Sequence, residues 1–128
     1  MLFRSDDFIS RMPEGYETIV GERGVGLSGG QKQRLSLARA LAVRPSILIL
    51  DDTTSAVDLE TERQIQESLR NLDFKATKLI IAQRVSTAKT ADRIIILKDG
   101  RILEEGSHAE LAASGGYYAE LVQLQEGL

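Results

Sequence analysis

The sequence predicts an α/β fold in which helices flank a parallel β-sheet and a β-hairpin follows near the C-terminus. Three short apolar runs, at 47–50, 79–82 and 94–97, are rich in β-branched residues and have no polar face. This pattern is typical of strands buried on both faces in a parallel sheet. Because helical patterns lie between the runs, the order of elements is that of an α/β layer fold.

The helices can be placed by their periodicity and by their ends. The first covers 29–43 and stops before Pro45, since proline does not continue a helix. The second covers 59–72 and places Ile65, Leu69 and Leu72 at helical spacing. Both helices therefore have the length expected of connections between strands of one sheet.

The C-terminal third predicts a hairpin and two short helices. Asp99-Gly100 is a two-residue hairpin signal, so we expect 101–105 to return antiparallel to 94–97 at the end of the sheet. Ser107 and Glu110 have the spacing of a capping box for a helix through 113. Glycines at 115–116 then precede a last amphipathic helix at 117–125.

Composition limits the chain to one domain or a part of one, with 128 residues of which 42% are hydrophobic. Lys and Arg total 16 against 19 Asp and Glu, without a basic run, so we expect no nucleic-acid partner. The absence of cysteine excludes disulfides and thiolate metal sites. No apolar run approaches the roughly 18 residues that span a bilayer, so we expect a soluble segment.

The segment Leu27-Ser28-Gly29-Gly30-Gln31 is the most informative part of the chain. Ser28 and Gln31 have capping-box spacing. The two glycines would leave backbone N–H groups bare at the helix N-terminus, where the helix dipole favours an anion such as phosphate. An ordinary cap after a flexible loop is the alternative interpretation of these five residues.

Acidic and amide side chains follow two of the predicted strands. Asp51 and Asp52 come directly after 47–50, at the strand end where ligands bind in open α/β sheets, and the first can hold Mg²⁺ through water. A polar turn follows at 55–58, and Gln83 lies at the end of the next strand. An acid after an apolar strand is common, so its position after the glycine pair is what favours a site.

In order and spacing, these segments resemble the ATP-binding domain of ABC-type exporters. The resemblance places the signature motif at 27–31, the Walker B strand and acid at 47–51, the D-loop at 55–58 and the switch-histidine position at Gln83. The segment 18–24 is similar to the loop that touches the membrane domain in exporters. The resemblance extends through 106–111 and 116–118 to the C-terminus.

The resemblance implies a P-loop NTPase-like fold that is truncated in this chain. No Gly-x-x-x-x-Gly-Lys-Ser/Thr occurs, so the Walker A half is lacking and we expect no activity from the chain alone. We interpret 1–128 as one partial domain, with the loop and signature helix in 6–42 and the Walker B to C-terminal part in 43–128.

The resemblance also implies ATP and Mg²⁺ as cofactors and assigns residues to them. It assigns nucleotide contact to Leu27, Ser28, Gly29, Gly30, Gln31 and Asp58, the metal to Asp51, and catalysis to Asp52 and Gln83. The family has Glu where this chain has Asp52, whose carboxylate falls on the order of 1 Å short, a misplacement that can cost about 100-fold in rate. Gln83 replaces a histidine and cannot become a cation. Together the two changes predict a degenerate site.

The family's domains dimerise head to tail, so the signature motif of this chain would complete the nucleotide site of a second ATP-binding domain. We expect a different subunit, with Glu and His, as that partner. The coupling helices of a transmembrane domain would be contacted through Thr18, Val20, Gly21, Glu22 and Arg23. The expected function is export coupled to ATP hydrolysis, with this segment at the cytoplasmic face of the membrane.

Two other functions remain open from the sequence. Chromosome-maintenance and DNA-repair ATPases share the motif order, but they would add long heptad helices and a basic surface. A non-enzymatic half-domain that docks on a transporter is the second. We expect His108 to be structural, Arg34 and Arg39 to be solvated or paired within the domain as readily as bound to phosphate, and Tyr117 and Tyr118 to pack the last helix.

Overall fold

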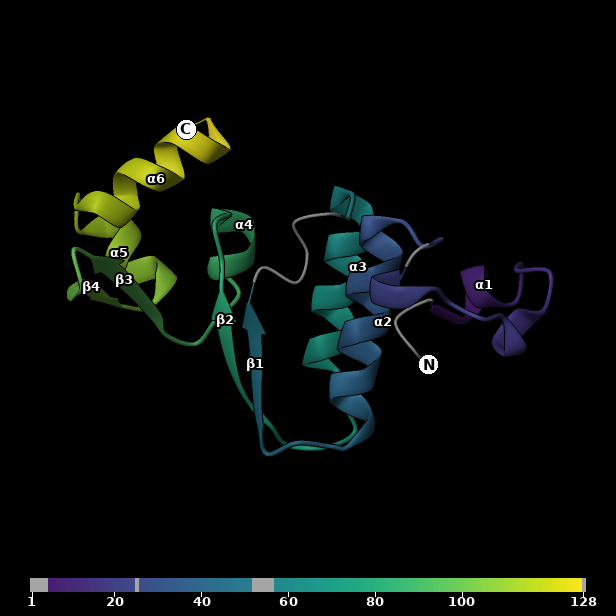
Figure 1. The fold of residues 1–128 in the computed structure, drawn as a ribbon. Helices are drawn as coiled ribbons and strands as arrows, with labels where there is room; N and C mark the ends of the chain where they lie inside the picture. Colours follow the sequence, from purple (N-terminus) through teal and green to yellow (C-terminus); the bar gives the residue numbers. More distant parts are fainter. Residues whose placement is uncertain (1–4, 25, 52–56, 128) are drawn as a thin grey trace. The chain divides into compact units, whose positions relative to one another are not determined.

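The computed structural model describes residues 5–24, 26–51 and 57–127 and divides the chain into two units, 1–79 and 80–128. Each unit contains helices, and the described strands form two separate two-stranded sheets (Figure 1). Among the helices of the described residues, none combines the length and the apolar character needed to cross a bilayer.

The first unit holds two long helices and a two-stranded sheet. Its elements are α1 (Ser5–Ile9), η1 (Gly15–Glu17), η2 (Glu22–Gly24), α2 (Gly29–Ala42), β1 (Ile47–Asp51), α3 (Leu59–Arg70) and the start of β2 (Thr77–Ile81). β1 pairs with β2 in parallel. Because α2 and α3 run opposite to β1, both helix N-termini lie at the same end of the unit as the carboxyl end of β1 (Figure 1).

Only one face of β1 is covered, which corrects the expectation of strands buried on both faces. Leu48 and Leu50 are buried, whereas Ile47 and Ile49 are 66% and 62% exposed. Leu37 of α2 and Ile65 of α3 are buried as well. Side chains alternate across a strand, so a sheet with helices on one face buries every second residue.

The second unit is built on the hairpin of β3 (Ile94–Lys98) and β4 (Arg101–Gly106). Asp99 and Gly100 both have positive φ, 51° and 73°, as a two-residue hairpin turn of the primed type requires. The hairpin is thus confirmed. It forms a sheet separate from β1 and β2, so the expectation that 94–97 extends the same sheet is wrong for the described residues.

Three helices complete the second unit: α4 (Val85–Ala88), α5 (His108–Ala113) and α6 (Tyr117–Glu126). The capping box of α5 is confirmed, because Ser107 Oγ accepts from the Glu110 N–H and the Glu110 carboxylate accepts from the Ser107 N–H. α1 and α4 were not predicted from the sequence, and β2 covers 77–81 instead of the expected 79–82.

Tyr118 is the centre of the second core. It is 1% exposed and packs with Val85, Ile94, Leu111 and Val122. The expectation that Tyr118 packs the last helix is therefore confirmed.

Tyr117 corrects the same expectation, because it is 42% exposed. The Lys98 Nζ lies 5.4 Å from its ring centroid, within the range of a cation–π contact. Consecutive residues of a helix point about 100° apart, so Tyr118 and Tyr117 cannot both face the core.

Candidate functional site

The start of α2 has the capping box that its sequence predicts. Ser28 Oγ accepts from the Gln31 N–H at 3.2 Å, and Gln31 Oε1 accepts from the Ser28 N–H at 2.9 Å. Gly29 and Gly30 occupy the first two helical positions. The N–H groups of these positions have no partner inside a helix and carry no side chain beside them, so they are available to an anion.

Two glycines with positive φ also define the loop that precedes this helix, and their conformation was not predicted from the sequence. Gly24 and Gly26 have φ of 74° and 98°, a region that other L-residues rarely adopt. The Leu27 N–H donates to the Gly24 carbonyl at 3.0 Å and closes the turn before Ser28. A Cβ at Gly24 would lie 3.0 Å from Lys32 Cε, so the loop packs closely on the first turn of α2.

Asp51 and Asp58 lie at the ends of elements in the same unit. Asp51 is the last residue of β1 and is exposed. Its carboxylate is the hard oxygen donor that Mg²⁺ prefers, so the residue fits the predicted metal. Asp52 lies outside the described residues, as do 55 and 56 of the predicted D-loop.

Asp58 caps α3 with both carboxylate oxygens. Oδ1 accepts from the Thr61 N–H at 2.9 Å and Oδ2 accepts from Thr61 Oγ1 at 2.8 Å. These bonds, the backbone one foremost, hold the pKa of Asp58 below its ordinary value. The residue therefore has a structural task in addition to the nucleotide contact predicted for it.

The structure brings three of the predicted features to one end of the first unit. The N-termini of α2 and α3, which carry Ser28 and Asp58, lie at the same end as Asp51 (Figure 1). This is the arrangement that helices antiparallel to a strand produce. Gln83 belongs to the second unit, so it is described by itself.

Gln83 follows β2 and has an exposed side chain. Its backbone carbonyl accepts a hydrogen bond of 3.2 Å from Gln125 Nε2 on α6. The sequence offered no sign of this contact, because the two residues are 42 positions apart.

The predicted membrane-contacting loop exposes apolar side chains. Ile19 is 90% exposed and its neighbour Val20 is exposed as well. Thr18 Oγ1 donates to the Gly15 carbonyl at 2.7 Å, which fixes the start of the loop. Gly21 and Glu22 are exposed, and the backbone of Arg23 belongs to η2.

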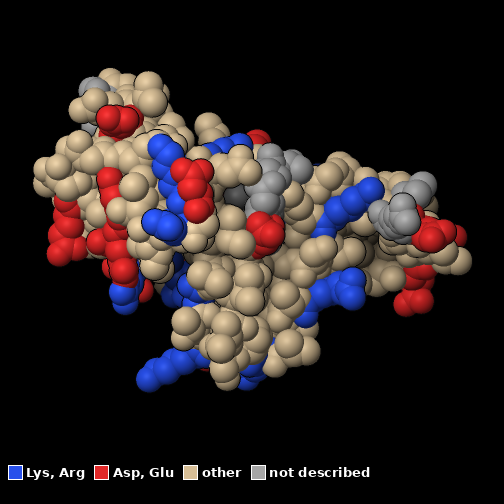
Figure 2. All heavy atoms as spheres, turned by 60° about the vertical axis from the view of Figure 1, so that its left-hand side comes forward, with Lys and Arg blue, Asp and Glu red and all other residues tan. Residues whose placement is uncertain are grey.

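Other polar residues have structural partners. His108 Nδ1 lies 2.9 Å from the Tyr118 hydroxyl, and the two rings pack edge to face, which supports the structural role expected of His108. The Arg34 guanidinium lies 5.1 Å from the Phe8 ring centroid, so α2 packs on α1 through this pair. Acidic and basic side chains both appear on the face drawn in Figure 2.

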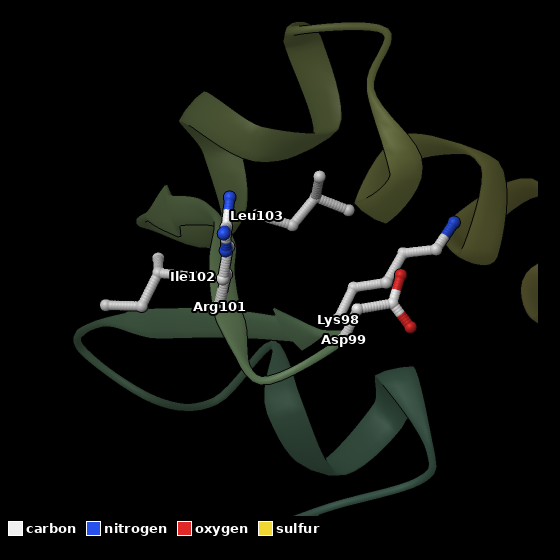
Figure 3. Close-up of a pocket in the computed structure, with 5 residues that line it drawn as sticks. All are labelled: Lys98, Asp99, Arg101, Ile102 and Leu103. Atoms are coloured by element: carbon white, nitrogen blue, oxygen red, sulfur yellow. The ribbon is translucent and has the colours of Figure 1, made fainter.

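A shallow hollow lies at the β3–β4 turn, and none of its lining residues is a predicted site residue. It is lined by Lys98, Asp99, Arg101, Ile102 and Leu103 (Figure 3). Lys98 and Ile102 extend to opposite sides in this view. Lys98 and Asp99 extend to the same side of the turn in this view.

Comparison with known proteins agrees with the motifs in this geometry. The family described as ABC transporter matches residues 4–55. The uncharacterized ABC transporter ATP-binding protein YknU of Bacillus subtilis is 52% identical over 122 residues, which cover 95% of this chain and 21% of that protein. The ATP-dependent lipid A-core flippase of Aromatoleum aromaticum is 54% identical over 119 residues, which cover 93% of this chain and 20% of that protein.

A solved structure of a bacterial Atm1-family ABC exporter with ATP bound is also similar, with a TM-score of 0.88 and 47% identity. The similarity covers 94% of this chain and 21% of the exporter chain. The chain thus spans about a fifth of the length of these relatives, and it matches them over nearly all of its own. By sequence and by fold, this chain belongs to the ATP-binding proteins of ABC transporters.

Proposed function

We propose that this chain is part of the ATP-binding subunit of an ABC exporter and couples ATP binding and hydrolysis to export across a membrane. The observation that carries the proposal is the start of α2, where a local capping box holds Gly29 and Gly30 as bare amides at a helix N-terminus. The names of two relatives specify lipid A-core flipping and cyclolysin secretion, which are different cargoes, so we propose no cargo.

In this proposal, the signature segment and the residues Asp51 and Asp58 contact two different bound nucleotides. Leu27 to Gln31 complete the ATP site of a second ATP-binding domain, because the amides of Gly29 and Gly30 point outward from the helix start. Asp51, through Mg²⁺, and Asp58 serve ATP held by this chain's own subunit. Mg²⁺ would supply charge neutralisation between phosphate oxygens, and Asp51 would orient it through water.

The subunit's own site is degenerate in this proposal. Asp52 stands where the family carries Glu, and its carboxylate is one methylene too short to orient the attacking water. Gln83 donates a neutral hydrogen bond to the γ-phosphate in place of an imidazole. The second domain is therefore a different subunit, which carries Glu and His and turns over ATP at the site that this chain's signature completes.

The proposed contact with the membrane domain is the loop 18–23 at the cytoplasmic face. The side chain of Ile19 is 90% exposed to solvent in this chain. Burying this apolar surface against a coupling helix would stabilise the contact. Thr18, Val20, Gly21, Glu22 and Arg23 complete this surface. The apolar pair Ile19 and Val20 would anchor it.

The degenerate site can be tested in the full-length complex reconstituted in vesicles. Replacing Asp52→Glu together with Gln83→His should raise phosphate release from this subunit's site by roughly 10- to 100-fold, because both changes restore groups that act on the attacking water and the developing charge. A matched pair, Asp73→Glu with Gln123→His, changes the same residue types at exposed positions and should leave the rate unaltered. No gain from the first pair would overturn the proposed degeneracy.

The division of labour has its own test. Gly29→Val places a branched side chain beside the bare amides and should lower hydrolysis at the partner's site by at least about 10-fold. Ala40→Val adds the same branched side chain to an exposed position of the same helix and serves as the control. If Gly29→Val leaves the rate at the partner's site intact, α2 does not complete that site.

A further inference from the structure

The side chain of Gln125 on α6 forms hydrogen bonds with the backbone of two residues, Gln83 and Val85, in the segment that follows β2. Gln125 Oε1 accepts from the Val85 N–H at 2.8 Å, and Gln125 Nε2 donates to the Gln83 carbonyl at 3.2 Å. One amide group therefore bridges residues 83 and 85. All of these residues belong to the second unit.

This bridge replaces a cap that the local sequence does not supply. Val85 is the first residue of α4, and its predecessor Arg84 makes no side-chain hydrogen bond as N-cap. The first N–H groups of a helix have no partner within it and need one from outside. Here the partner comes from 40 residues further along the chain.

The helix that carries Gln125 is itself held firmly against α4. Val85 of α4 shares the core with Tyr118 and Val122 of α6. Lys89 Nζ pairs with Glu126 Oε1 at 2.6 Å, one residue beyond Gln125. At the other end of α6, the Glu104 carboxylate accepts from the Tyr117 and Tyr118 N–H groups at 2.6 and 3.0 Å.

We infer that Gln125 is a positioning residue for Gln83. The hydrogen bond to the Gln83 carbonyl fixes one peptide of that residue, and the bond to Val85 fixes the turn that follows. The direction in which the Gln83 side chain leaves the backbone is thereby set by α6. The inference rests on the proposed role of Gln83 as the group that contacts the γ-phosphate of ATP.

The effect on function should appear as a change in discrimination between ATP and ADP. Only ATP carries the phosphate that Gln83 would contact, so a displaced Gln83 weakens ATP binding and leaves ADP binding as it was. A general loss of stability would weaken both nucleotides together. The ratio of the two affinities therefore separates positioning from a merely structural role.

The experiment uses the full-length exporter complex. The Walker A lysine of the other ATP site is replaced by Ala, so that only the site containing Gln83 binds nucleotide. Fluorescent ATP and ADP analogues are titrated into the wild type and the variants. Gln125→Met removes both hydrogen bonds at nearly constant volume, and Gln83→Ala removes the side chain that it positions. Each should lower the ratio of ATP to ADP affinity by about fivefold, and the double variant by no more than either alone.

Two further variants separate the contributions. Gln123→Met is an exposed change on the same helix, outside the bridge, and should leave the ratio unchanged. Gln125→Glu keeps the acceptor for Val85 but places a carboxylate oxygen against the Gln83 carbonyl. It should lower the ratio as Gln125→Met does while keeping a higher melting temperature, which also covers the case in which Gln125→Met fails to fold.

The outcomes separate this inference from the proposed function. A normal ratio in Gln125→Met, alongside a lowered one in Gln83→Ala, would overturn the inference and leave the function standing. Losses that add up in the double variant would also overturn it, because the two residues would then act independently. A normal ratio in Gln83→Ala would instead remove the proposed role of Gln83, and the inference with it.

Discussion

The N-termini of α2 and α4 differ in where the hydrogen-bond partners of their backbone N–H groups come from. At α2, Ser28 and Gln31 satisfy each other's N–H groups within four residues of chain. At α4, the Val85 N–H is satisfied by Gln125, 40 residues away. The cap of α2 is therefore supplied by near neighbours, whereas the Val85 N–H of α4 depends on a side chain of α6.

This difference matters because each helix start lies beside a predicted site residue. Gly29 and Gly30 lie within the first turn of α2, and their geometry is fixed by near neighbours. Gln83 lies two residues before α4, and its backbone depends on a distant helix.

The largest effect should come from undocking α6 in the 128-residue chain. Tyr118→Ala removes a ring that is 1% exposed and should lower the free energy of unfolding by roughly 3–5 kcal/mol. Urea unfolding followed by circular dichroism measures the loss. Tyr117→Ala, at an exposed ring on the same turn, is the control and should cost less than about 1 kcal/mol.

Hydrogen exchange in the same variant sharpens the comparison. The Val85 amide should lose its protection when Tyr118 is removed, because its partner is carried by α6. The amides of 31 and 32 at the start of α2 should keep theirs. Equal loss at both helix starts would contradict the view that one is capped locally and the other from a distance.

A smaller effect is expected from breaking the local cap. Ser28→Ala removes the acceptor for the Gln31 N–H and should cost about 1 kcal/mol of stability. Exchange at Gln31 should accelerate while exchange at Val85 stays the same. Ser36→Ala, an exposed change in the same helix, is the matched control, and an equal cost there would show that the cap contributes nothing.

The smallest effect concerns pH and contrasts a charged cap with the neutral Gln125. Hydrogen bonds from Thr61 lower the pKa of Asp58 in the folded chain. A carboxyl whose folded pKa lies below its unfolded value stabilises the fold above the unfolded pKa of about 4, and this contribution disappears as the pH falls through the folded pKa.

Asp58→Asn keeps a capping acceptor that does not titrate. The stability of the wild type relative to this variant should therefore fall in thermal melts as the pH drops below the unfolded pKa of about 4. Gln125→Met, which removes a neutral cap, should show a cost that does not vary over the same range. A constant difference between wild type and Asp58→Asn would mean that folding leaves the pKa of Asp58 unchanged.

Features that depend on near neighbours could be predicted from the amino-acid sequence. Capping-box spacing at Ser28 and Ser107 and the Asp99-Gly100 turn specify their own hydrogen bonds or backbone angles, and each is found in the structure. The α/β class likewise follows from the order of apolar runs and helical periods. These features can be recognised in the sequence because the interacting groups are two to four residues apart.

The covered faces of the strands and the contacts between distant residues depend on how the elements pack, so they could not be predicted from the sequence. Apolar runs suggested strands buried on both sides, but Ile47 and Ile49 face outward because the helices of the described chain cover one face alone. The cap of α4 by Gln125 and the burial of Tyr118 rather than Tyr117 depend on where α6 docks. Contacts between residues 40 positions apart produce no periodic pattern in the sequence. Nothing in the sequence therefore distinguishes Gln125 from a glutamine that has no tertiary partner.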